Sequence, residues 1–189
     1  MKKLSFLASL MVLCLPLAAF AQETAPKVEI FGGYSYLRAD SGDTGIDDIG
    51  LHGFSASLAG NITKHIGIVG EFSRSTKTQS FSDPVIGQIT ADLRVTTYLF
   101  GPRVTFLRGK ADPFVHALFG GAHARAEISG VPGSDSGFAF ALGGGLDVKV
   151  NDNFAIRVAQ VDYLGDKVAD ETGNNFRFSV GVVIRLGKR

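Results

Sequence analysis

The residues of this 189-residue chain that could do chemistry are charged side chains standing among small ones. Asp147 and Arg157 lie five positions either side of Asp152, the centre of an Asn-Asp-Asn turn signal. A hairpin turning there would place the two opposite each other. A carboxylate and a guanidinium paired away from water form either a structural ion pair or one step of a path for ions or protons. We expect the structural ion pair.

The same reasoning extends to the two ends of the chain. If a sheet closes on itself, its first and last strands are neighbours, and Glu29 then meets Arg185. Other charged residues alternate with small residues in the same way and should point into the same interior. The predicted interior charge network comprises Glu29, Glu71, Arg103, His116, Asp147, Arg157, Arg177 and Arg185.

Other kinds of chemistry find little support. The four histidines, at positions 52, 65, 116 and 123, form no metal-ligand spacing, and no Gly-x-Ser-x-Gly elbow is present. His52 and the nearby serines Ser55 and Ser57 fall on opposite parities. The acids at positions 40, 43, 47 and 48 lack the closing glutamate of a calcium loop. We therefore expect no catalytic residue, no metal and no cofactor.

The elements that carry these charges alternate with a period of two. In Phe138–Val150, large apolar residues share one parity, and Ala, Gly and Asp share the other. Asn175–Leu186 places six apolar residues on one face, against Arg, Ser and Gly on the other. This alternation is typical of strands, and neither segment shows a helical stripe.

Weaker copies of the pattern predict four further strands, and composition predicts two more, Phe114–Arg125 and Phe154–Leu164, whose facing stays open. The connections between strands alternate in length. Tight turns are expected at 61–65, 107–112 and 151–153, and long polar loops at 39–50, 76–88, 127–137 and 165–174. With eight strands, both termini then lie at the end that carries the short turns. The eight predicted strands are Lys27–Leu37, Leu51–Ile62, His65–Ser75, Ile89–Phe106, Phe114–Arg125, Phe138–Val150, Phe154–Leu164 and Asn175–Leu186.

The first 21 residues have the pattern of a secretory signal peptide. A cationic start is followed by an apolar stretch and by Ala19-Phe20-Ala21, so we expect cleavage before Gln22. An uncleaved anchor is the alternative, but the apolar stretch is short for a spanning helix. Cleavage removes the only cysteine, Cys14, and leaves 17 basic and 18 acidic residues in a single domain over 22–189. That balance makes nucleic acid an unsuitable partner.

Composition decides which face of the strands meets water. The chain is 45% hydrophobic and holds 24 glycines and 15 phenylalanines. A soluble lipocalin-like barrel would need a polar outer face, yet the minority face is mostly Gly, Ala and Ser with a few charges. Gly101, Gly121, Gly143, Gly145 and Gly181, on the strand faces, are interpreted as packing positions that leave room for arginine side chains and ease strong curvature. We therefore predict an all-β, eight-stranded, antiparallel up-and-down transmembrane β-barrel with its apolar face toward lipid.

Aromatic residues near the ends of the apolar faces are the expected interfacial girdles. These are Tyr34, Tyr36, Tyr98, Phe100 and Tyr163.

Several segments resemble the small eight-stranded outer-membrane barrels of the OmpA transmembrane-domain and OmpX type, within the porin-like outer-membrane β-barrels. The resemblance covers 22–189. Its carriers are Phe31-Gly32-Gly33-Tyr34-Ser35-Tyr36, Phe100-Gly101-Pro102-Arg103, Pro113-Phe114, Asp162-Tyr163 and Asn175-Phe176-Arg177-Phe178-Ser179-Val180-Gly181.

The resemblance implies a location in a Gram-negative outer membrane, with periplasmic termini and surface loops. It implies contact with outer-membrane lipid and lipopolysaccharide, insertion by the barrel-assembly machinery, and a loop partner that it does not identify. Two features depart from the family: the sequence ends Leu186-Gly187-Lys188-Arg189 without the usual final aromatic residue, and we expect no peptidoglycan-binding domain and hence no OmpA-like tether to the cell wall.

Fold does not fix activity, so three functions remain open. The first is a structural or adhesive barrel with a plugged interior. The second is a narrow pore for small solutes or ions. The third is a lipid-modifying enzyme, although we expect the protein not to be one.

Overall fold

A computed structural model describes residues 25–39, 49–83, 87–107, 109–128, 131–168 and 171–188. The predicted signal peptide at 1–21 and the acids at 40, 43, 47 and 48 lie outside the described residues. No helix among the described residues is long and apolar enough to cross a bilayer.

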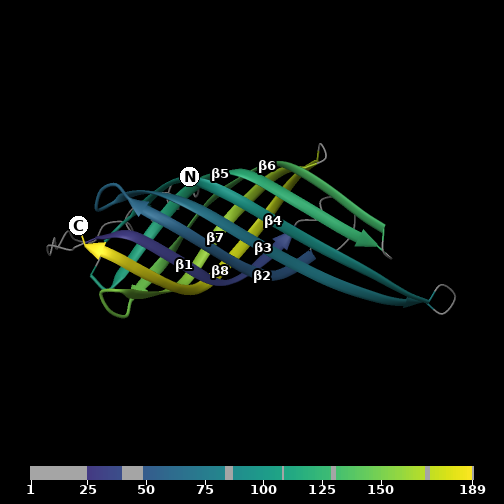
Figure 1. Cartoon of the computed structure of the whole chain (residues 1–189), viewed down its shortest axis with the longest axis horizontal. Coiled ribbons are helices and arrows are strands. Elements are labelled where there is room, and N and C mark those ends of the chain that lie inside the picture. Colours follow the sequence, from purple (N-terminus) through teal and green to yellow (C-terminus); the bar gives the residue numbers. More distant parts are fainter. Residues whose placement is uncertain are drawn as a thin grey trace, which may run out of the picture.

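Eight antiparallel strands form one closed barrel in chain order, which confirms the predicted fold class (Figure 1). β1 pairs with β8, so closure brings the first and last strands together, with Glu29 opposite Arg185. A closed sheet pairs backbone groups along both edges of every strand, as hydrocarbon requires. The strands are β1 (Pro26–Ala39), β2 (Ile49–Asn61), β3 (Ile66–Asp83), β4 (Gly87–Thr105), β5 (Ala111–Ile128), β6 (Val131–Lys149), β7 (Phe154–Val168) and β8 (Glu171–Lys188).

Tight turns lie at the end of the barrel where β1 begins and β8 ends (Figure 1). In the β6–β7 turn, the Asn151 side-chain oxygen accepts hydrogen bonds from the backbone N–H groups of Asn153 and Phe154, at 2.9 and 2.8 Å. In the β4–β5 turn, Gly109 adopts a φ of 69°, a left-handed conformation that glycine tolerates without strain. The turn signals in the sequence therefore mark real turns.

The prediction of a long loop was wrong for three of the four segments. The segments 76–88, 127–137 and 165–174 lie mostly within paired strands, and β3 and β4 stay in register from Ile66↔Val104 to Asp83↔Gly87. Figure 1 shows the β3–β4 hairpin, and to a lesser extent the β5–β6 hairpin, reaching past the end of the barrel opposite the short turns. An antiparallel ladder satisfies its backbone groups whatever the side chains are, and Thr favours strands, so polar composition does not end the pairing.

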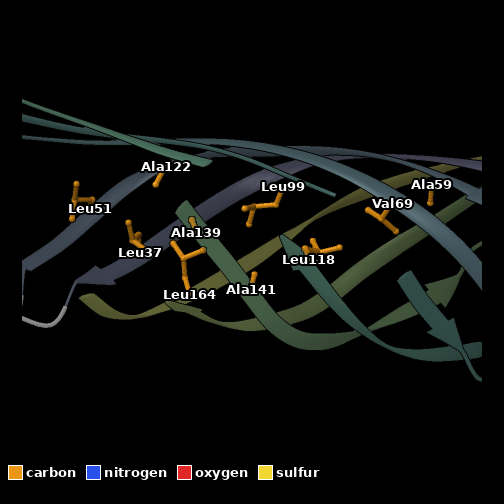
Figure 2. Packing of buried hydrophobic residues seen from close by; sticks show 10 residues of the cluster. All are labelled: Leu37, Leu51, Ala59, Val69, Leu99, Leu118, Ala122, Ala139, Ala141 and Leu164. Atoms are coloured by element: carbon orange, nitrogen blue, oxygen red, sulfur yellow. The ribbon is translucent and has the colours of Figure 1, made fainter. Parts of the chain in front are cut away.

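The two faces of the strands differ as the alternation predicted. On β8, Phe176, Phe178 and Val180 are exposed on the outside, whereas Arg177 and Ser179 are buried inside. Apolar side chains also line the interior over much of its length (Figure 2). They are Leu37, Leu51, Ala59, Val69, Leu99, Leu118, Ala122, Ala139, Ala141 and Leu164.

A β-bulge in β7 changes which parity faces inward. The register with β8 shifts between Arg157 and Gln160. Before the shift, Ala155 and Arg157 are buried; after it, Gln160, Asp162 and Leu164 are buried. One extra residue on one strand reverses the face of everything that follows.

Candidate functional site: the charged interior of the barrel

The eight charged residues predicted for the interior are all buried within the barrel. Asp112, Gln160 and Asp162 join them there and were not among the predicted network residues. Together they form two connected clusters, one beside the short turns and one farther along the barrel. Every strand except β2 contributes inward-facing residues to the clusters, and on β7 the inward parity changes at the bulge.

The turn-side cluster is built around Glu29 and Asp112. Glu29 lies 3.5 Å from Arg185 and also contacts the Arg103 guanidinium. Arg185 reaches on to Asp112 at 3.0 Å, and Lys149 approaches the other Asp112 oxygen at 3.3 Å. The pairing of Glu29 with Arg185 follows the sequence expectation, whereas the Arg103–Glu29 contact crosses between strands that are not neighbours.

Arg157 lies at the centre of the interior. It donates from Nε and Nη2 to the two Asp147 oxygens, at 2.8 and 3.1 Å, in the fork geometry that favours guanidinium–carboxylate pairs. Its Cζ atom lies 4.3 Å from the Phe31 ring centroid and 4.4 Å from that of Phe114. Two aromatic rings and one carboxylate thus replace the water that this cation gives up.

Glycines make room for those two rings. A Cβ added to Gly145 would lie 2.7 Å from the Phe114 ring, and one added to Gly181 would lie 2.9 Å from the Phe31 ring. Neighbouring backbone lies closer still, with the Ala159 oxygen 2.5 Å from the added Cβ of Gly145 and the Gly32 oxygen 2.3 Å from that of Gly181. The expectation that these glycines accommodate arginines directly was therefore wrong at these two positions, because backbone and rings fill the space. Gly121 does not leave room for an interior arginine either: on β5 the even positions such as His116 are buried, which places Gly121 outward.

Gln160 joins Arg157 to a second arginine. Its carbonyl oxygen accepts from Arg157 at 2.7 Å, and its amide nitrogen donates to Asp162 at 2.8 Å and to Glu71 at 3.1 Å. Arg177 then contacts Glu71, and it donates to Asp162 at 2.7 Å and to the Ser73 hydroxyl at 3.0 Å. The β7 bulge is what turns Gln160 and Asp162 inward to complete this bridge.

His116 ends the network on the β5 side. Its Nε2 atom lies 2.7 Å from an Asp162 oxygen, and its ring contacts Phe114 at a centroid distance of 5.7 Å. Gly143 faces this pair: a Cβ there would lie 2.2 Å from the Asp162 carboxylate. Chemically, the interior holds two clusters of buried charges, each compensated by oppositely charged partners.

The predicted girdle aromatics lie on the outer surface. Tyr34, Tyr98 and Phe100 are 49%, 52% and 67% exposed. Tyr36 packs against the His52 ring at 5.2 Å, and Tyr163 packs between Phe140 and Phe176 at 6.0 and 5.7 Å. Arg157 and Tyr163 share a parity but face opposite sides, because the bulge lies between them.

The described residues contain no group of three or more potential metal ligands. His52 contacts the Tyr34 hydroxyl, not the serines considered in the sequence. A different pair is brought together instead: His123 Nδ1 lies 2.7 Å from the Ser136 hydroxyl on the exposed surface of the β5–β6 hairpin. Their opposition across two strands could be found only once the register of this hairpin was known.

A model of the outer membrane protein beta-barrel domain family matches residues 6–186. Ail, the attachment invasion locus protein of Yersinia pestis, solved with the heparin analogue sucrose octasulfate, shares 21% identity at a TM-score of 0.62, over 86% of this chain and 99% of Ail. Neisserial surface protein A shares 13% identity at a TM-score of 0.67, over 87% of this chain and 100% of that one. No curated protein gives a significant match.

At these identities the solved structures show a shared fold and nothing further. The family model spans nearly the whole chain, and the closed barrel with its apolar outer face agrees with it. The chain therefore belongs to the outer membrane protein β-barrel domain family and is an integral protein of the Gram-negative outer membrane.

Proposed function

We propose that this protein is a closed, non-conducting barrel that anchors its long hairpins in the outer membrane, where they do structural or adhesive work. The observation that carries the proposal is the interior network, which joins β1, β3, β4, β5, β6, β7 and β8 through buried ion pairs and hydrogen bonds. An eight-stranded barrel has an interior just wide enough for side chains to fill.

Opening a pore through this interior would require separating buried charges. Arg177 forms ion pairs with both Glu71 and Asp162, and Arg157 forms one with Asp147. Leaving one partner of a buried pair uncompensated costs about 3–5 kcal/mol. Several such pairs lie in series along the barrel, so spontaneous opening is strongly disfavoured and a plug is the better reading than a pore.

The polar hairpins supply the proposed working surface. β3 and β4 continue beyond the apolar belt with exposed Thr76, Thr78, Asp92 and Arg94. We place these hairpins outside the cell and the termini and short turns in the periplasm, because small outer-membrane barrels carry short periplasmic turns. Outer-membrane lipid and lipopolysaccharide then surround the belt, the barrel-assembly machinery inserts the chain, and the hairpins meet an extracellular partner. Ail, named the attachment invasion locus protein and solved with a heparin analogue, has the same fold and supports the proposed adhesive role.

Two measurements test the proposal. Purified barrel in planar bilayers should give no stable channels, and large, long-lived openings would overturn the plug. In the trimmed variant, Asn-Gly replaces residues 79–91, so that the hairpin closes at the partners Thr78 and Asp92. Cells carrying the wild-type barrel should adhere to surfaces coated with host extracellular matrix better than cells carrying this variant. Equal adhesion by the trimmed barrel would remove this hairpin from the proposed role.

A second candidate draws on one contact. The His123–Ser136 pair is exposed and joins a base to a hydroxyl, the starting arrangement of a serine nucleophile. No carboxylate contacts His123 among the interactions of the described residues, so the group that would orient the ring is missing from the pair. Mass spectrometry of lipid A from cells expressing wild type and Ser136→Ala decides it: a wild-type-specific change in acylation would establish an enzyme.

A further inference from the structure

The lipid-facing wall of the barrel is not uniformly convex. A groove of about 570 Å³ runs over β1 to β4. Its outward-facing lining is apolar, with Ile30, Leu58, Phe72, Tyr98 and Phe100 around a floor that includes Ala56 and Gly70.

Small residues create the groove. Gly70 is exposed, and a Cβ added there would meet nothing within 4 Å. It is flanked across the strands by Leu58 and Phe100, and Ala56 stands opposite Phe72. Large side chains beside very small ones leave a channel on the outer surface, because the small residues do not fill the space between the large ones. The channel is shaped for a narrow apolar group such as an acyl chain.

Arginines follow the groove on the side of the long hairpins. Arg74 comes two residues after Phe72 on the same outer face, a rise of about 7 Å along the strand. Farther along, Arg94 and Arg125 are direct partners across β4 and β5, and Thr76 is the β3 partner of Arg94. All three arginines are exposed. They form a positive row immediately beyond the apolar belt, which we call the arginine rim (Arg74, Arg94 and Arg125).

On the outer face of β4 and β5, the carboxylates lie one step farther from the belt than the arginines. Asp92 and Glu127 are partners beyond Arg94 and Arg125, and Asp92 accepts a hydrogen bond from Thr78 at 2.5 Å. A polar recess of about 160 Å³ lies among these side chains. A group rising from the membrane therefore meets the arginines before it meets the acids, so the membrane boundary favours an anion.

We propose that the groove and the arginine rim together bind one phosphorylated glycolipid of the lipid A class, with an acyl chain in the groove and its phosphates on the rim. Arginine forks suit phosphate, and three arginines spread over three strands suit a headgroup with more than one phosphate. The leaflet assignment rests on the proposed orientation, which puts the rim in the outer leaflet. Phosphatidylglycerol, a phospholipid that is also anionic, is the competing ligand that the experiment must exclude.

The headgroup half is tested with refolded full-length barrel in detergent micelles, titrated with bis-phosphorylated lipid A, with lipid A stripped of its phosphates, and with phosphatidylglycerol. The variant is Arg74→Gln/Arg94→Gln/Arg125→Gln. One arginine near a phosphate surface contributes about fivefold in affinity, so we expect the triple variant to lose on the order of a hundredfold for lipid A. We expect the dephosphorylated lipid to bind wild type as weakly as lipid A binds the variant.

Matched controls separate this site from general effects. Lys27→Gln/Lys64→Gln/Lys110→Gln removes the same number of exposed charges at the short-turn end and should leave lipid A affinity within about twofold. Gly70→Leu fills the groove, whereas Gly60→Leu adds the same side chain at another open outer position that does not line it. Only Gly70→Leu should weaken binding. All variants are first checked for heat-modifiable migration, which reports a folded barrel.

The proposal is overturned if the arginine and lysine triple variants bind lipid A alike, if phosphatidylglycerol binds wild type as tightly as lipid A does, or if Gly70→Leu and Gly60→Leu behave the same. Binding in micelles does not depend on which way the barrel faces or on adhesion. A failed titration therefore leaves the proposed function standing, and a conducting or non-adhesive barrel leaves the lipid site standing.

Discussion

Replacing Arg177 with methionine should destabilise the barrel strongly, because this guanidinium compensates two buried carboxylates at once. Methionine keeps much of the length and removes the charge. Arg177 is 1% exposed; it contacts Glu71, donates to Asp162 at 2.7 and 3.1 Å, and donates to Ser73 at 3.0 Å. Each of these bonds ends on a group that is itself buried.

The expected loss of unfolding free energy is about 3–5 kcal/mol, the cost of leaving a buried ionic partner uncompensated. Adding up the separate bonds at about 1.5–3 kcal/mol each would give more, but bonds that share one guanidinium are not additive. Asp162 also keeps His116 and Gln160 as partners at 2.7 and 2.8 Å, which limits the loss. The cost therefore arises mainly from Glu71, whose described donors then reduce to Gln160.

Urea unfolding of the refolded barrel in detergent or lipid vesicles measures this loss. Glu71→Gln/Arg177→Met/Asp162→Asn should recover a large part of it, because the stranded charges are gone. Lys64→Met, in an exposed turn, should change stability by no more than about 0.5 kcal/mol. A loss below about 1 kcal/mol for Arg177→Met, or a triple variant no more stable than the single one, would refute the view that buried charges are mutually compensating here.

Three further outcomes follow from the structure. Gly33→Val should prevent the β1–β8 closure and abolish the heat-modifiable folded form on gels, because a Cβ there would lie 2.1 Å from a backbone carbonyl oxygen of β8. A nitroxide attached at Leu142→Cys should be far more accessible to oxygen dissolved in lipid than one at Ala141→Cys, since the two residues are 49% and 0% exposed on opposite faces; equal accessibility would contradict the assigned faces. The pKa of the Asp152 carboxyl should lie below its ordinary value because Lys188 donates a hydrogen bond to it and attracts its charge. This pair therefore stabilises the fold above the unfolded-state pKa of Asp152, and the stabilisation is lost as pH falls through the lowered folded-state pKa. An NMR titration in which Lys188→Met leaves the Asp152 midpoint unchanged would contradict this cause.

The sequence carried the fold because strand alternation is a local property. The parity of Phe176 and Arg177 already separates the lipid face from the interior. The pair of Asp147 and Arg157 is equally local, since a short turn fixes the register of the residues just beyond it. Predicting the pair of Glu29 and Arg185 required one further premise, that a sheet in a membrane closes on itself. Closure makes the first and last strands neighbours.

Strand ends were less predictable. Polar residues in 76–88 suggested a loop, yet they continue the β3–β4 ladder to Asp83↔Gly87. Composition reports what a side chain prefers to contact, whereas pairing depends on whether a partner strand lies alongside. The apolar pattern ends where the membrane ends, and the strands do not have to end there.

What only the tertiary structure decided is how the interior residues meet. Arg177 contacts Glu71, 106 positions earlier in the chain, across the lumen, and Arg103 likewise contacts Glu29. The β7 bulge turns Gln160 and Asp162 inward, where alternation counted from Arg157 would place both outside. A period of two gives the side of the wall that a residue faces; it contains neither the slip of one residue at a bulge nor the curvature that brings opposite walls within reach. Sequence therefore determined most of the enclosed residues, whereas the bulge turned Gln160 and Asp162 inward and barrel closure determined the partners.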